Sequence, residues 1–178
     1  KSVSNEISFA VSLTDRKEIQ ARIATMAHKV GRRLRRKGIE GTTLHLKIRR
    51  EDLSVRTCQR HKADLGTNDL AWLPELYSML NEVWDGWEPL RLIGVGVSGF
   101  NDDPVQGTLF DIAPSSEANE ISINSPLIRK AEANKKLLEA NDLIAQRFGE
   151  NAVRFGHELR TYQETTGSSA KNPEDYKD

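Results

Sequence analysis

The stretch GTTLHLKIRREDLSVRTCQRHKAD, residues 41–64, contains two runs in which apolar and polar side chains alternate. In residues 41–52 the apolar side carries Leu44, Leu46 and Ile48. In residues 54–64 one side carries Arg56, Cys58, Arg60 and Lys62. Alternation with a period of two is typical of β-strands. With a short turn at residues 51–53, the stretch predicts a hairpin that presents a row of cations on one sheet face.

The residues before this hairpin predict a strand followed by a long helix. Residues 5–13 alternate again, with Ile7 and Phe9 on one side. From residue 14 to residue 38, apolar residues recur at helical spacing, at Ile19, Ile23, Met26, Val30 and Leu34. Thr14 or Asp15 can cap this helix, and Gly38 supplies its end.

The residues after the hairpin predict a second helix and a last strand. Residues 68–86 have helical spacing of leucines, with Asn68 or Asp69 as the cap. Residues 89–100 are apolar and rich in β-branched residues, which indicates a buried strand. Gly94, Gly96 and Gly99 leave one side of that strand almost bare, and bare glycines often mark a close approach by another backbone.

The order β-α-β-β-α-β within about 100 residues predicts an α+β fold, a four-stranded sheet with two helices on one face. The other face stays open and is expected to carry Lys47, Arg49, Arg56, Arg60 and Lys62. Residues 101–126 contain turn formers and few apolar residues, so we expect a linker there. Residues 127–156 predict a helical extension, and residues 157–178 a flexible tail.

Composition limits the classes of protein that the chain can belong to. Residues 1–100 hold 17 Lys and Arg against 12 Asp and Glu, whereas residues 101–178 hold 9 against 14, which indicates an anionic partner for the first part. The single cysteine, Cys58, excludes an internal disulfide and fits a reducing compartment. With no long apolar run and no signal peptide pattern, we expect a cytoplasmic location and no membrane partner. The start at Lys1 suggests a piece of a longer protein.

Three functions fit the predicted cationic face. Cations spaced along a sheet suit the phosphates of a DNA duplex, without reading of sequence. An RNA-binding α/β domain is a second reading, but the face lacks the exposed aromatic residues on which single strands stack. A protein-interaction module is the third, and a merely solvated face is the alternative to all of them.

The basic run KVGRRLRRKG, residues 29–38, places six Lys and Arg at the end of the first helix. Cations there complement the helix dipole. On that helix Val30 and Leu34 point inward, which turns the arginines away from the open sheet face. We interpret them first as helix-end charges, and second as a contact with phosphate or another domain.

Candidate catalytic residues are absent from the sequence pattern. The stretch GVGVSG, residues 94–99, lies in a strand and lacks the lysine and helix of a phosphate loop. The histidines and Cys58 do not have zinc spacing, so we expect no catalytic residue, no metal site and no cofactor in these residues. The segment QGTLFD, residues 106–111, offers a glutamine followed by two apolar side chains, a pattern suited to docking on a partner.

Three stretches together resemble the C-terminal little finger domain of Y-family DNA polymerases, most closely the DinB, or DNA polymerase IV, branch. They are KSVSNEISF (1–9), AHKVGRRLRRKGIEGTTLHLKIRREDLS (27–54) and PLRLIGVGVSGF (89–100). The resemblance implies a four-stranded sheet that lies against primer–template DNA and grips both backbones during translesion synthesis. It also implies a parent nucleotidyltransferase that uses Mg²⁺ held by carboxylates elsewhere in the polymerase.

The resemblance also implies which residues contact the partners. The strand start, where backbone amides approach a phosphate, corresponds to Lys1, Ser2, Val3 and Ser4, and further DNA-facing positions correspond to Lys47, Arg49, Arg56, Arg60 and Ser98. Cys58 departs from the family pattern, which often has a cation there. QGTLFD is similar to the motif that binds the bacterial sliding clamp: Gln106, Leu109 and Phe110 match it, whereas Gly107 departs from it.

Overall fold

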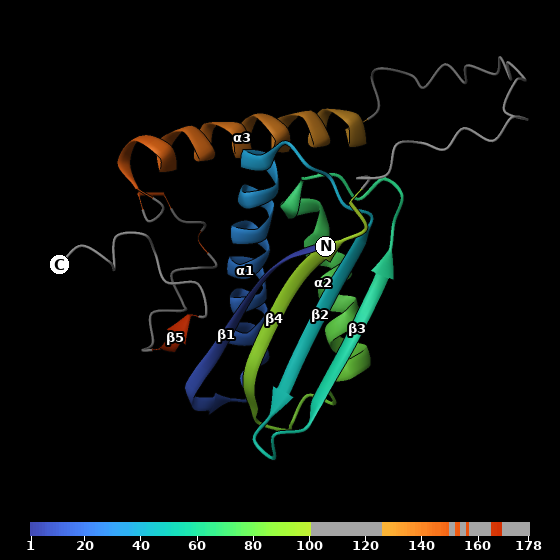
Figure 1. Cartoon of the computed structure of the whole chain (residues 1–178), viewed down its shortest axis with the longest axis vertical. Coiled ribbons are helices and arrows are strands. Elements are labelled where there is room, and N and C mark those ends of the chain that lie inside the picture. The colour runs from blue at the N-terminus through green and yellow to red at the C-terminus, as the bar shows by residue number, and fades with distance from the viewer. Residues whose placement is uncertain (101–125, 150–151, 154–155, 157–164, 169–178) are drawn as a thin grey trace, which may run out of the picture.

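The computed structural model describes residues 1–100, 126–149, 152–153, 156 and 165–168 (Figure 1). Within residues 1–100 the elements follow the predicted order: β1 (Ser2–Leu13), α1 (Arg16–Lys37), β2 (Thr43–Arg50), β3 (Val55–His61), α2 (Asp69–Val83) and β4 (Leu90–Ser98). A further helix, α3 (Pro126–Phe148), and a short strand, β5 (Thr165–Ser168), follow. The predicted α+β class is therefore confirmed.

The strands form an antiparallel sheet in the order β3-β2-β4-β1-β5. The helices α1 and α2 lie together along one face of it, and the opposite face is covered by neither (Figure 1). The strand β5 pairs with β1 and extends the sheet by one short edge strand, which the sequence pattern did not predict. In the described part of the chain, no helix combines the length and the apolarity that a membrane crossing requires.

The helices begin and end where their capping residues allow. The side chain of Asp15 accepts a hydrogen bond from the backbone N of Lys17 at the start of α1, and Asn68 accepts one from Ala71 at the start of α2. Gly38 ends α1 with φ +62°, a left-handed conformation that glycine adopts without steric cost. Asp15 and Asn68 are therefore the caps, and each is one of the two residues predicted to cap its helix.

The core lies between the sheet and the two helices. Residues that are directly opposite on neighbouring strands point to the same face. On β2 and β4 these pairs are Leu44–Val97, Leu46–Val95 and Ile48–Ile93, and all six side chains are at most 1% exposed. The apolar side predicted for β2 is thus the side that packs against α1 and α2.

The predicted facing of β3 is wrong. The register pairs Leu44 with Arg60, Leu46 with Cys58 and Ile48 with Arg56. Partners share a face, so Arg56, Cys58 and Arg60 lie on the helix side of the sheet and not on the open face. The cations do share one side, as predicted, but it is the side that holds the core residues of β2.

Candidate nucleic-acid interface

The face of the sheet that no helix covers, called here the open face, is built from alternate residues of four strands. On β2 and β3 it consists of Thr43, His45, Lys47, Arg49, Val55, Thr57, Gln59 and His61. On β1 and β4 it consists mainly of small residues, Ser2, Ser4, Glu6, Ser8, Leu92, Gly94, Gly96 and Ser98. It contains no Phe, Tyr or Trp, so it offers no stacking platform for single-stranded bases.

A shallow hollow of about 260 Å³ runs over β4 in the open face. It is present because Gly94 and Gly96 contribute no side chain between the flanking strands. A Cβ atom at Gly96 would lie 3.1 Å from the Cβ of Ser4, and one at Gly94 would lie 2.7 Å from the Cγ of Glu6. The bare glycines noted in the sequence therefore permit a close approach across the strands.

An ion pair spans this hollow. Glu6 on β1, Gly94 on β4 and Lys47 on β2 stand in one row of the sheet. The Nζ of Lys47 lies 3.1 Å from each carboxylate oxygen of Glu6. Both side chains are about one third exposed, so the pair is open to solvent on its outer side. Lys47, a predicted DNA contact, is thus already paired with a carboxylate.

His45 lies next to this pair and does not add to the positive charge of the face. Its Nε2 is 2.5 Å from the Oγ of Ser98. Burial lowers the pKa of His45, because desolvation disfavours the charged imidazolium. At pH 7 the side chain is therefore neutral.

Several residues that the sequence assigned to DNA lie on the open face. They are Ser2, Ser4, Lys47, Arg49 and Ser98. Lys1 precedes β1, and Val3 lies on the core side, opposite Val97. Arg49 is half-buried, and none of the described residues forms an ion pair with it. Among the cations assigned to DNA, only Lys47 and Arg49 project from the strands on this face.

The other assigned cations belong to the helix side, where α2 carries acidic residues. Arg60 forms ion pairs with Glu75, at 2.8 Å, and with Glu82. Lys62 lies 3.7 Å from Glu75. The placement of Arg56, Arg60 and Lys62 on the open face was wrong because the register with β2 turns them to the helix side, where acidic residues of α2 pair with Arg60 and Lys62.

Cys58 also lies on the helix side. Its Sγ donates to an Oε of Glu82 at 3.4 Å. Burial and the neighbouring Glu82 carboxylate both raise the pKa of the thiol, so it stays protonated at neutral pH. At this position a cation would meet α2 and not the open face.

The basic run at the end of α1 joins three elements. The Nε of Arg35 lies 2.5 Å from Asp142 on α3, and its Nη1 donates to Asp69 at 3.0 Å and to the carbonyl of Thr67 at 2.8 Å. Burial opposes the charge of Arg35, but the Asp142 and Asp69 carboxylates outweigh it and raise its pKa. Arg32 also reaches Asp142, at 3.2 Å. These arginines contact other elements rather than serving only as helix-end charges.

Behind Arg35 is a buried polar contact that sequence reasoning missed. Asp69 is fully buried at the start of α2, and one of its oxygens lies 2.7 Å from the Nδ1 of His28 on α1. Asp69 was considered only as a helix cap, and Asp142 was not singled out. Arg35 and Asp142 are 107 positions apart, so no spacing in the sequence could connect them.

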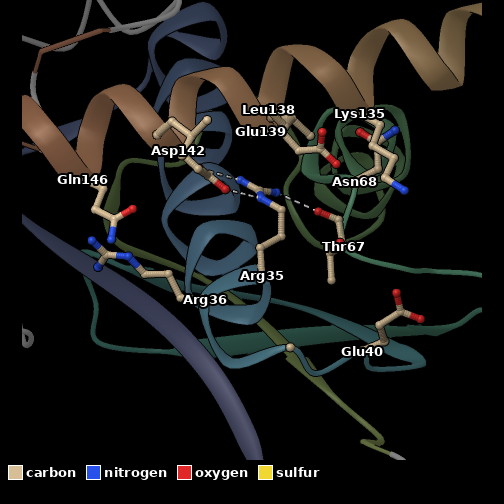
Figure 2. Close-up of a pocket in the computed structure, with 12 residues that line it drawn as sticks. Arg35, Arg36, Glu40, Thr67, Asn68, Lys135, Leu138, Glu139, Asp142 and Gln146 are labelled. Carbon is tan, nitrogen blue, oxygen red and sulfur yellow. Dashed lines mark hydrogen bonds and ion pairs between the residues drawn. The ribbon is translucent and has the colours of Figure 1, made fainter.

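A pocket of about 1210 Å³ lies where α3 crosses the C-terminal end of α1 (Figure 2). Arg35, Asp142 and Thr67 meet at its centre, and Lys135, Glu139 and Gln146 line its α3 side. Its charged groups are of both signs, so it lacks the single-sign potential that attracts a polyanion.

The structure does not describe the segment predicted to bind the sliding clamp. Gln106, Leu109 and Phe110 lie outside the described residues. Within the described ranges, no group of three or more His, Cys, Asp or Glu side chains is arranged to hold a metal ion.

Curated relatives that match this chain are named DNA polymerase IV. The one from Streptomyces coelicolor is 38% identical over 121 residues, 67% of this chain and 25% of that protein. The one from Brucella melitensis biotype 1 is 30% identical over 160 residues, 88% of this chain and 32% of that protein. The chain thus spans about a quarter to a third of the length of these relatives.

Solved structures with a similar fold include a complex of the β-clamp processivity factor and the little finger domain of PolIV. The likeness has a TM-score of 0.49 at 18% identity and covers 63% of this chain and 100% of that chain. An insertion ternary complex of Dbh DNA polymerase has a TM-score of 0.46 at 13% identity, covering 56% of this chain and 28% of that chain.

The sequence of residues 1–109 matches the impB/mucB/samB family C-terminal domain. This match covers every element from β1 to β4, and these elements follow the predicted order of strands and helices. The chain therefore belongs to the impB/mucB/samB C-terminal domain family, the little finger domain of Y-family DNA polymerases, and is of the DinB, or DNA polymerase IV, type.

Proposed function

We propose that this little finger domain holds duplex DNA against its open face by contacts to the sugar–phosphate backbone. The observation that carries the proposal is a sheet face that neither α1 nor α2 covers, with small side chains on β1 and β4 beside Lys47 and Arg49 on β2. Small residues let a backbone approach closely, and Arg49 supplies charge to the phosphates, while Lys47 shares its charge with Glu6. Such contacts position DNA without reading its sequence.

The number of cations on the face sets the strength expected of this binding. Each phosphate contact adds about −0.9 to the slope of log affinity against log salt. Arg49 therefore predicts a shallow slope of about −0.9, and Lys47 adds a contact of similar size only when it leaves Glu6. This is weak binding, which suits a domain that the rest of a polymerase keeps at the DNA.

The proposal assigns the chemistry to other parts of the parent polymerase. Nucleotidyl transfer by such an enzyme uses Mg²⁺ held by clustered carboxylates. The described residues of this chain offer no such cluster, so no catalytic step is assigned to them. The role proposed for the domain is to position the primer–template.

The segment QGTLFD, residues 106–111, is proposed to bind the sliding clamp. Gln106 can donate and accept hydrogen bonds, while Leu109 and Phe110 fill an apolar pocket. In a clamp-binding assay, Leu109→Ala with Phe110→Ala should abolish binding and leave duplex affinity unchanged. Clamp binding by that variant at the affinity of the unsubstituted chain would contradict this assignment.

The DNA-binding proposal is tested with a pair of arginines on opposite faces of the sheet. Arg49→Gln removes a cation from the open face, whereas Arg56→Gln removes one from the helix side. With a labelled duplex of about 20 base pairs at about 0.1 M salt, we expect Arg49→Gln to weaken binding about three- to tenfold for every sequence. Arg56→Gln should change it by less than about twofold, since it faces away from the duplex.

Fluorescence anisotropy gives the affinities, and competitor strands separate the nucleic-acid classes. Equal effects of the two substitutions would contradict binding through the open face. Stronger competition by single-stranded RNA than by duplex DNA would instead support an RNA-binding domain.

A further inference from the structure

We propose that Glu6 limits the affinity of the open face for DNA by holding Lys47 away from the phosphates. The inference rests on the proposed function, because it concerns how strongly that face binds a duplex. It identifies Glu6, which the sequence pattern did not single out, as the residue that determines how much of the cationic charge of β2 reaches DNA.

The geometry places the carboxylate where it neutralises the centre of the face. Glu6 and Lys47 belong to strands that are not neighbours, and β4 runs between them. They meet because the residue between them in the row is Gly94, which has no side chain to separate them. Both oxygens of Glu6 lie 3.1 Å from the Nζ of Lys47. The ammonium group therefore points sideways over β4 towards Glu6, and not outward from the sheet towards an approaching duplex.

The pair is suited to exchange and not to stability. Both side chains are about one third exposed, and exposed ion pairs contribute at most about 1 kcal/mol to folding. A duplex that approaches this face must either leave Lys47 with Glu6 or displace the carboxylate by a phosphate. In both cases binding carries a cost, since the carboxylate remains close to the phosphates and repels them.

A matched ion pair lies on the other side of the sheet. Arg60 on β3 is paired with Glu82 on α2, and Glu82 is half exposed. Replacing Glu82 by glutamine also removes one negative charge beside a cation, although Arg60 keeps its second partner, Glu75. It does so on the face that the helices cover, so it controls for the change in net charge alone.

The experiment is a double-mutant cycle on the full chain with a labelled DNA duplex of about 20 base pairs. Glu6→Gln should bind about three- to tenfold more tightly than the unsubstituted chain at about 0.15 M salt, and its salt slope should be steeper by about 0.9. Lys47→Gln should change affinity by less than about twofold in the presence of Glu6. In the Glu6→Gln background, the same change should remove the gain.

The outcomes separate this inference from the proposed function. Failure of the unsubstituted, folded chain to bind duplex at low salt would overturn the proposed function. Binding by that chain with no gain in Glu6→Gln would overturn only the inference, and so would an equal gain in Glu82→Gln or a zero coupling energy between Glu6 and Lys47. Circular dichroism confirms folding, and Glu6→Ser, which extends the serine pattern of β1, repeats the test if the glutamine variant misfolds.

Discussion

At the scale of single residues, the three-residue turn at residues 51–53 determines which way β3 faces. The turn of residues 51–53 lies between Arg50 and Ser54, whose backbone N and O atoms are 3.0 Å apart. A turn with an odd number of residues places even-numbered positions of both strands on the same side, which puts Arg60 beside Leu44. Such turns usually carry glycine at the left-handed position, but here that residue is Leu53, with φ +69°.

The same residue supplies a prediction about stability. A leucine in the left-handed region costs about 1 kcal/mol, and Leu53 is 65% exposed, so its side chain contributes little to packing. We expect Leu53→Gly to raise the free energy of unfolding by about 0.5–1 kcal/mol, measured by urea denaturation. Leu53→Ala keeps the unfavourable φ and serves as the control, which should show no gain. Equal stabilisation by both substitutions would contradict the strain argument.

The sequence pattern was enough to predict those features that depend on one helix or one strand alone. The apolar side of β2, the caps Asp15 and Asn68 and the end of α1 at Gly38 all follow from local chemistry, and the structure confirms them. The facing of β3 also follows from the predicted turn at residues 51–53, whose odd length puts even-numbered residues of both strands on one side, contrary to the facing predicted for Arg56 and Arg60. The pairing of Glu6 with Lys47 depends on strand order, because β4 must lie between β1 and β2.

At the scale of elements, α3 is attached to the domain through an acidic residue and buried apolar residues. Asp142 receives Arg32 and Arg35 from α1, while Leu138 and Ala145 are the buried apolar residues on the same helix face. The sequence predicted a helical extension at residues 127–156, and α3 occupies Pro126–Phe148 of it. The place where it docks could not be predicted, because it depends on a contact between residues far apart in the chain.

This attachment predicts how α3 responds to the loss of Asp142. Asp142→Asn removes the charge that the two arginines share, which should weaken the docking of α3 by about 1–2 kcal/mol. Amide hydrogen exchange within α3 should then be about five- to thirtyfold faster. Glu139→Gln is the control, since Glu139 lines the same pocket and no ion pair with it is found among the described residues. Unchanged exchange in Asp142→Asn would show that apolar contacts alone hold the helix.

At the scale of the whole molecule, the fold is carried by residues 1–100. Every buried residue of the main hydrophobic core lies between Phe9 and Val97, and α3 contributes none of them. The open face also lies within this part, on β1 to β4. The main core therefore ends at Val97, and α3 and β5 attach to this unit at α1 and β1.

A chain that ends after residue 100 should consequently fold alone and bind DNA as the longer chain does. It loses the Asp142 ion pairs, the contacts of Leu138 and Ala145 and the pairing of β5 with β1, so we expect its free energy of unfolding to fall by no more than about 2–3 kcal/mol. Its urea transition should remain cooperative, because the main core is intact. Its duplex affinity and salt slope should match those of the full chain, since α3 packs at α1, which lies on the covered side of the sheet. A broad transition or a changed slope would show that the residues after 100 contribute to the core or to the DNA-binding face.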